Sequence, residues 1–462
     1  MSVRSAKKKR VRRSGAIEPE VDLGNVLCYA DQGSFLGLRA LGRQPTLHLT
    51  WIYPHPLERA AVLQFARRIA QGLLGRVVQR SALPWGRHRW VASPVPPAVT
   101  WRETPVAIEA LQATRSDLFD LPIDPEHGPG WRLVVQPLNG GGTALSMLVS
   151  HTIADGQACV QALVSAITGQ GLAHGLPARS WRWSPWMLVR DSAQSLHSLP
   201  AAWRAVNELW RNVHMIKPGK LRPVPPLRHR EDTLSDPVVE VPLVCVGMDA
   251  GLCEQLAMDR GVASNTLLLA FATRLAFRLG RVDAAGQVKL ALPVSNRQPG
   301  DRRGNALQPA SVVVDPTVCH ADLPGLQRQV RRAFADILRN GDGISMLAPL
   351  VLYVPRWLVR KMEWHALGAD LPVGCSMLGK LPAELGNPVG KGELIQFSAL
   401  ERYTKSALER LEGLLFIVSY RIGDRQIVTV SGYQPDRATT RATLVPVVRA
   451  ALDDIGLAAT VV

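Results

Sequence analysis

Ser150-His151-Thr152-Ile153-Ala154-Asp155-Gly156 is the stretch from which the rest of this chain can be interpreted. It follows the short apolar run 143–149, which is typical of a buried strand and comes directly after the turn signal Gly140-Gly141-Gly142. Beyond the stretch, apolar residues recur at helical spacing. The pattern therefore places His151 at the exit of a buried strand and Asp155 near the first turn of a helix.

A histidine in this position suits acyl transfer. Strand ends border the clefts in which ligands bind, and an imidazole exchanges a proton near neutral pH. His151 could deprotonate a hydroxyl or amine that attacks a thioester carbonyl, and then protonate the leaving thiolate, without any side-chain nucleophile. The residues leave one alternative open: His151 is a hydrogen-bonded histidine at a strand end, and Asp155 is only a helix N-cap.

The segment His151–Gly156 resembles the H-x-x-x-D-G signature of the CoA-dependent acyltransferase superfamily, which includes chloramphenicol acetyltransferase and the condensation domains of peptide synthetases. From about Leu23 to the C-terminus, the chain is most similar to the bacterial wax ester synthase/diacylglycerol acyltransferases. The resemblance implies an α+β fold of two chloramphenicol acetyltransferase-like lobes that form a pseudo-dimer with a tunnel between them. We expect a basic disordered tail at 1–22, lobes at 23–180 and 238–462, and a crossover helix and linker at 181–237.

The resemblance also implies an activity, an O-acyltransferase that moves a fatty acyl group from acyl-CoA to a lipid or other alcohol. His151 would be the general base in the middle of the tunnel, with Asp155 and Gly156 completing the catalytic motif. No metal and no cofactor are implied, and acyl-CoA is a co-substrate. A second enzymatic reading takes the donor from a carrier protein, as condensation domains do.

Three further residues are expected to support the site. The segment 293–297 is similar to the P-V-S-x-R segment of the family, and Gly304-Asn305 to the G-N that follows it. In condensation-type relatives an arginine of this region pairs with the signature aspartate, which implies that Arg297 pairs with Asp155. A partly buried carboxylate needs a cation, and arginine offers bidentate geometry. Ser295 lies in the same segment, and Asn265 matches the asparagine of an N-D pair at a helix start.

The chain departs from the family pattern at three positions. Ser150 replaces the first histidine of the usual H-H-x-x-x-D-G, Gly130 replaces the leucine of a P-L-W segment, and Thr266 replaces the aspartate of the N-D pair. The loss of the first histidine leaves catalysis possible but weakens the assignment to wax ester or triacylglycerol synthesis. The three departures also motivate a non-enzymatic alternative, a degenerate member that binds lipid or serves as a scaffold.

The composition indicates a globular protein. Hydrophobic residues make up 47% of the 462 residues and charged residues 20%. The six cysteines occur singly, which indicates neither a zinc site nor a disulfide framework, and we expect a cytoplasmic protein. No apolar window reaches the ~18 residues expected of a membrane-spanning helix.

The chain is basic, with a net charge of 54 − 38 = +16. Seven lysines and arginines precede the first acidic residue. Nucleic acid could explain this charge, but no recognisable nucleic-acid module accompanies it, and we expect no nucleic-acid partner. The remaining alternatives are attraction to an anionic membrane surface and a solubilising tail.

Tryptophan is concentrated between residues 178 and 230, where five of the twelve tryptophans lie. A helix is predicted at 200–214, with Trp203 and Trp210 on one face and Arg204 and Arg211 away from it. This arrangement suits peripheral contact with a membrane or lipid-droplet surface. The alternative is a crossover helix that packs its tryptophans onto the lobes.

Overall fold

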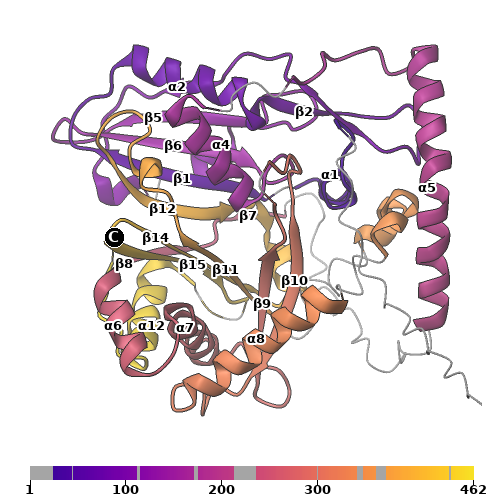
Figure 1. The fold of residues 1–462 in the computed structure, drawn as a ribbon. Helices are drawn as coiled ribbons and strands as arrows, with labels where there is room; N and C mark the ends of the chain where they lie inside the picture. Colours follow the sequence, from indigo (N-terminus) through magenta and orange to yellow (C-terminus); the bar gives the residue numbers. More distant parts are fainter. Residues whose placement is uncertain are drawn as a thin grey trace, which may run out of the picture.

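The computed structural model describes residues 24–43, 45–111, 115–170, 175–212, 236–298, 300–340, 347–360, 371–435, 437 and 439–461. The predicted tail at 1–22 and most of the predicted linker lie outside the described residues. Two β-sheets, each covered by helices on its outer face, form the body of the molecule (Figure 1).

The first sheet has five strands and carries the motif. Its order is β12 (Glu393–Leu400), β1 (Thr46–Tyr53), β6 (Thr143–Ser150), β5 (Trp131–Pro137) and β4 (Val99–Trp101). The β4–β5 pair is parallel, and the other pairs are antiparallel. Helices α2 (Arg59–Gln71) and α4 (Gly156–Thr168) lie on its outer face (Figure 1). β5 and β6 form an antiparallel pair on either side of the Gly140-Gly141-Gly142 turn.

Alternation along β1 explains the two faces of this sheet. Leu47, Leu49 and Trp51 are buried in the core that includes residues of α2 and α4. Because successive side chains of a strand point to opposite faces, His48 and Thr50 lie on the inner face. One core thus forms on the outer side of the sheet, and polar side chains collect on the other.

The second sheet has seven strands. Their order is β10 (Leu307–Val314), β9 (Val288–Ser295), β11 (Val373–Lys380), β14 (Leu414–Ile422), β15 (Arg425–Tyr433), β8 (Leu243–Asp249) and β16 (Thr460–Val461). Four helices lie on its outer side: α6 (Ala250–Asp259), α7 (Ser264–Arg278), α8 (Leu323–Asn340) and α12 (Arg441–Asp453) (Figure 1). Apolar residues from these helices and from the sheet form a second core.

One strand of the second half completes the first sheet. β12 pairs along its length with β1, from Glu393 opposite Ile52 to Leu400 opposite Thr46. The hydroxyl of Thr429 on β15 donates to the backbone carbonyl of Phe397 on β12 at 2.9 Å. The two halves of the chain are therefore interleaved, and the expected lobe boundaries stay predictions.

Smaller elements complete the described fold. They are α1 (Tyr29–Leu41), η1 (Leu73–Gly75), β2 (Arg76–Gln79), β3 (Arg89–Ala92), η2 (Ile108–Leu111), α3 (Ser116–Phe119), α5 (Pro185–Asn212), β7 (Val238–Val239), η6 (Ala348–Tyr353), η7 (Ala383–Gly386), β13 (Tyr403–Thr404) and α11 (Lys405–Arg410). The helix predicted from Pro200 begins earlier than expected, because Pro200 lies inside α5. None of the described helices is long and apolar enough to cross a membrane.

The inner face of the first sheet holds a buried polar cluster around His48. Its Nε2 lies 3.1 Å from the Thr50 hydroxyl, and its Nδ1 lies 2.8 Å from Nε2 of Gln396 on β12. Burial, and then the positive charge of Arg115, lowers the pKa of His48 to about 3. The imidazole is therefore neutral in the folded protein at neutral pH.

Stability should consequently fall in acid. The unfolded chain binds a proton at His48 below about pH 6.5 and the folded chain only near pH 3, so stability is lost as the pH falls through this window. We expect urea midpoints to drop between pH 6.5 and 4, and His48→Gln to reduce that drop. His127→Gln, at an exposed histidine, is the control. An identical pH dependence in wild type and His48→Gln would contradict the assignment.

Candidate active site

The motif forms the connection between β6 and α4, as the sequence predicts. β6 ends at Ser150, and the backbone N–H of His151 donates to the carbonyl of Pro45 at 3.0 Å. The Asp155 carboxylate accepts a hydrogen bond from the backbone N–H of Ala158 at 2.8 Å, which starts α4 at Gly156. The His151 side chain is half-buried at this strand end.

Asp155 is an anchor for the loop. Its carboxylate is fully buried and accepts from Arg297 Nη2 and from the backbone N–H of Ala306, each at 2.8 Å. The Arg297 side chain, 3% exposed, also donates through Nη1 to the carbonyl of Arg303 at 2.9 Å. The expected ion pair between Arg297 and Asp155 is present. Among the described residues, no hydrogen bond joins Asp155 to the imidazole of His151, so Asp155 fixes the backbone around it.

Asn305 holds the imidazole. The side-chain Oδ1 of Asn305 lies 3.1 Å from Nδ1 of His151. The Nδ2 group of Asn305 donates to Asp31 Oδ1 at 3.0 Å and to the carbonyl of His151 at 3.2 Å. Both of these partners are acceptors, so the amide can take only this orientation. The amide oxygen of Asn305 therefore accepts a hydrogen bond from Nδ1–H of His151. The ring proton is on Nδ1, and Nε2 carries the lone pair.

Asp31 of α1 orients Asn305. Its carboxylate is fully buried and accepts from the backbone N–H groups of Gly304 and Asn305 at 2.9 and 2.6 Å. A Cβ on Gly304 would lie 2.8 Å from Asp31 Oδ1 and 2.9 Å from the Ile153 carbonyl, so the close approach requires glycine. Three segments distant from the motif in sequence thus converge on it: α1, the residue Pro45 before β1, and the loop between β9 and β10 that carries Arg297 and Asn305.

Arg76 ties the same loop to β2. Its guanidinium donates through Nη2 to the Ile153 carbonyl at 2.6 Å and through Nη1 to the Arg302 carbonyl, and it lies 4.0 Å from the Trp90 ring centre. Burial lowers the pKa of Arg76 to about 10, so the group is still a cation at neutral pH. Arg76 and Asp31 form no sequence motif. Only their place in the fold reveals them.

The other predicted site residues are placed differently. Gly156 begins α4, where a Cβ would lie 3.0 Å from Leu378 Cδ2 on β11, so glycine lets the helix approach the second sheet. Ser295 ends β9 and accepts from the Arg297 backbone N–H at 3.3 Å. Asn265 is exposed in the first turn of α7, and no described hydrogen bond joins it to the His151 cluster. Its neighbour Thr266 bonds Gln327 of α8.

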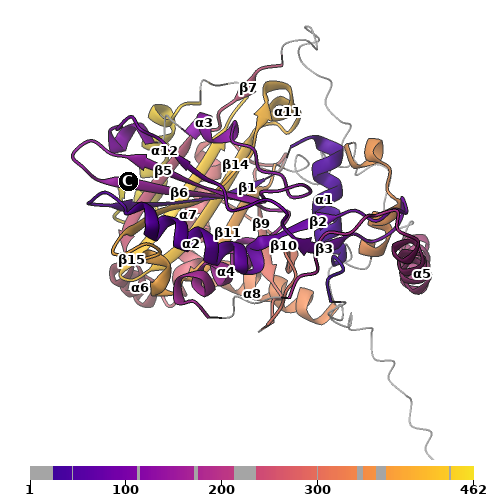
Figure 2. The same ribbon diagram turned by 90° about the horizontal axis from the view of Figure 1, so that it is seen from above.

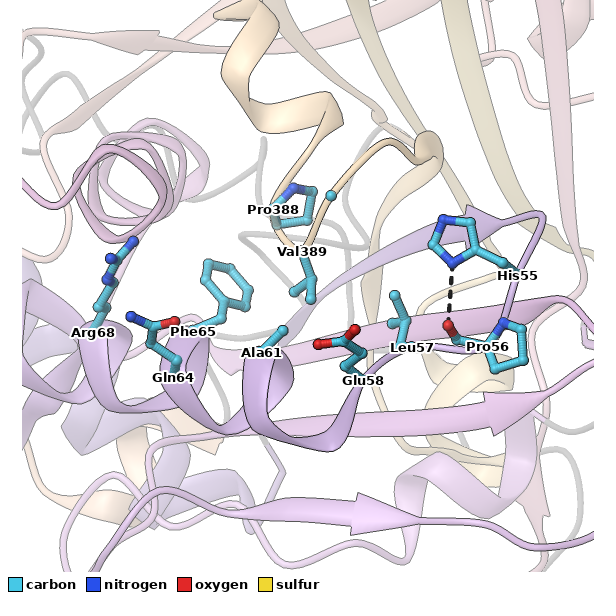
Figure 3. A pocket seen from close by; sticks show the side chains of 11 residues that line it. His55, Pro56, Leu57, Glu58, Ala61, Gln64, Phe65, Arg68, Pro388 and Val389 are labelled. Carbon is cyan, nitrogen blue, oxygen red and sulfur yellow. Dashed lines mark hydrogen bonds between the residues drawn. The ribbon is translucent and has the colours of Figure 1, made fainter.

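A cavity of about 360 Å³ lies elsewhere (Figure 3). It opens beside the start of α2, lined among others by His55, Glu58, Phe65 and Val389. β1 and β6 form one antiparallel pair. His55 lies just beyond the end where Tyr53 is opposite Thr143, and His151 lies just beyond the other end, where Thr46 is opposite Ser150. At ~3.3 Å per residue the two ends of this ladder are roughly 23 Å apart. The cavity is therefore separate from the motif. Among the described residues, no group of histidine, cysteine, aspartate and glutamate could hold a metal ion.

The fold is similar to that of peptide-synthetase condensation domains. The first condensation domain of the calcium-dependent antibiotic synthetase, in complex with a substrate analogue, matches with a TM-score of 0.57 at 14% identity over 94% of this chain and 99% of that chain. Polyketide synthase associated protein 5 from Mycobacterium tuberculosis matches with a TM-score of 0.52 at 13% identity, over 93% and 97% of the two chains.

A third structure is longer than this chain. The AMPPNP-bound form of the nonribosomal peptide synthetase FmoA3 matches with a TM-score of 0.53 at 18% identity over 95% of this chain, which spans 43% of FmoA3. No protein-family model and no curated protein matches. The comparisons thus support a mixed fold of helices and sheets like that of condensation domains, while the α+β pseudo-dimer of lobes and the tunnel stay predictions.

Proposed function

We propose that this protein is an acyltransferase in which His151 is the general base. The observation that carries the proposal is the hydrogen bond of 3.1 Å between His151 Nδ1 and Asn305 Oδ1. It leaves Nε2 as the basic nitrogen of a half-buried ring, and Nε2 has no hydrogen-bond partner among the described residues. A positioned imidazole with one free nitrogen is what general-base catalysis requires.

The reaction proceeds by direct attack. The acceptor hydroxyl loses its proton to His151 Nε2 while its oxygen bonds to the thioester carbonyl carbon. The tetrahedral intermediate collapses, the carbon–sulfur bond breaks, and the leaving thiolate takes the proton back from Nε2. Ester and free thiol are the products, and the enzyme returns to its starting state. Asp155, Arg297 and Asn305 keep the loop and the ring in place throughout.

The proposed acyl donor is a thioester on a pantetheine arm. Acyl-CoA and an acyl carrier protein both carry the acyl group in this form. The sequence favours acyl-CoA with a lipid alcohol, as in wax ester or triacylglycerol synthesis. The fold, which matches condensation domains, favours the carrier-bound donor as the second candidate. Both donors would present the same thioester to His151.

Matched assays separate the candidates. A fatty acyl-CoA and the same acyl group on a carrier protein are each incubated with a long-chain alcohol or a diacylglycerol, and ester is measured by mass spectrometry. Ester from acyl-CoA supports the first candidate, and ester only from the carrier supports the second. A protein that binds these lipids but forms neither ester nor free thiol from either donor would be a binding or scaffold protein, and the proposal would fail.

Asn305→Ala tests the positioning of the ring. A hydrogen bond of this kind is worth about 0.5–1.5 kcal/mol, so we expect kcat to fall about 2- to 13-fold, with KM for the thioester nearly unchanged. Asn387→Ala, at an asparagine that bonds the backbone of Gly392 after η7, is the control. A rise in KM at constant kcat would show that Asn305 serves substrate binding instead.

A further inference from the structure

Helix α5 stands at the side of the body, at the right of Figure 1 and in end view in Figure 2. Its 28 residues span about 42 Å. One side is held by buried residues, Met187, Asp191, Ser198 and Ala205. Asp191 accepts hydrogen bonds from Arg89 and from the Ser81 hydroxyl, each at 2.5 Å. The helix is therefore anchored along one line of its surface.

The opposite side of α5 is apolar and uncovered. Val189, Leu196, Trp203 and Trp210 recur every seven residues and are 70, 66, 68 and 71% exposed. Seven residues are close to two helical turns, so these side chains form one line that we call the outer line. Exposed apolar residues are ordinary when scattered singly, but a contiguous row of large ones marks an interaction surface. The predicted alternative, that this helix packs Trp203 and Trp210 onto the lobes, is wrong.

A basic line runs beside the outer line. Arg190, His197, Arg204 and Arg211 each follow one residue of the outer line, and they too recur every seven residues. The guanidinium of Arg190 lies 5.2 Å from the Trp186 ring centre and donates through Nη2 to Asn25 Oδ1 at 3.0 Å, so this end of the line is tied to the body, whereas Arg204 and Arg211 are exposed. The helix carries two acidic residues. Glu208 lies 3.9 Å from Arg211, and Asp191 is buried against Arg89.

We propose that α5 lies flat on an anionic lipid surface. The outer line would enter the boundary between headgroups and acyl chains, and the basic line would lie against the lipid phosphates. Tryptophan favours this boundary because one end of its ring system is apolar and the other is a hydrogen-bond donor. An antiparallel pair of copies fits less well, because it would bring the two basic lines together on one side of the pair. This proposal is independent of the catalytic one.

Vesicle co-sedimentation of the full chain tests it. We expect the protein to bind vesicles that contain phosphatidylglycerol, and to bind pure phosphatidylcholine vesicles at least about 10-fold more weakly, because charge attraction contributes at each basic residue. Trp203→Glu combined with Trp210→Glu should lower binding at least about 10-fold. Leu252→Glu combined with Met258→Glu is the control, because these α6 residues are 67 and 65% exposed on another side of the molecule.

Two further measurements complete the test. Arg204→Gln combined with Arg211→Gln should weaken binding to anionic vesicles while leaving thermal unfolding unchanged, because both side chains are exposed. Sedimentation velocity of the wild type should give a monomer. Equal binding by the tryptophan and control variants would overturn the proposal, and would assign lipid attraction to another basic part of the chain. A dimer that the tryptophan variant dissociates, without vesicle binding, would overturn it in favour of a second copy.

Discussion

Replacing Arg297 with methionine should lower the free energy of unfolding by about 3–5 kcal/mol, because it leaves the carboxylate of Asp155 buried without its cation. Asp155 is fully buried and Arg297 nearly so, and their nearest atoms lie 2.8 Å apart. Breaking one side of such a pair costs the solvation of the remaining charge. Chemical denaturation followed by circular dichroism measures the loss.

A surface ion pair provides the control for this substitution. Arg328 and Asp322 lie 3.9 Å apart, and both side chains are 63% exposed. Arg328→Met should change stability by less than about 1 kcal/mol, since water solvates the exposed partner. If both methionine variants unfold at the same denaturant concentration, then the Arg297 pair does not hold the motif loop.

Replacing His151 with alanine should lower the rate of acyl transfer about 10²- to 10⁴-fold, the usual contribution of a general base. The protein should remain folded, because the ring makes one side-chain hydrogen bond among the described residues, to Asn305, and the loop backbone is held by Pro45, Asp155 and Arg297. The rate is measured as free thiol and ester formed from the acyl thioester.

Another histidine serves as the control for the rate. His127 is exposed and bonds Asp124 at 2.9 Å, away from the motif. His127→Ala should transfer acyl groups at the wild-type rate. Unchanged thiol release by a folded His151→Ala protein would remove the imidazole from the mechanism and leave only the fold.

The local features of the site could be predicted from the sequence. The apolar run before the motif and the helical spacing after it gave the β6–α4 connection, since both signals are local in the chain. The pairing of Arg297 with Asp155 came from the resemblance. Gly130, which departs from the family pattern, has a local explanation: a Cβ there would lie 2.9 Å from Ile153 Cδ1, so the isoleucine side chain occupies the space beside it.

The long-range features could not be predicted. Asp31 lies in a helix without any motif, and only the tertiary fold brings it to Asn305, 274 residues later. β12 joins the first sheet from the second half, and no periodicity in a sequence specifies such a partner. Asn265 matched a family position, but it is exposed on α7. The sequence placed Trp203 and Trp210 on one helix face, but a helical pattern does not show which face is covered, so their exposure emerged only with the structure.

A structure of the protein with an uncleavable acyl-pantetheine, in which a methylene group replaces the thioester sulfur, tests the central claim most directly. The claim predicts the ligand carbonyl carbon about 5 Å from His151 Nε2, a separation that leaves room for one acceptor hydroxyl between them. A ligand carbonyl bound in the cavity beside α2, with His151 contacting no part of the ligand, would contradict it.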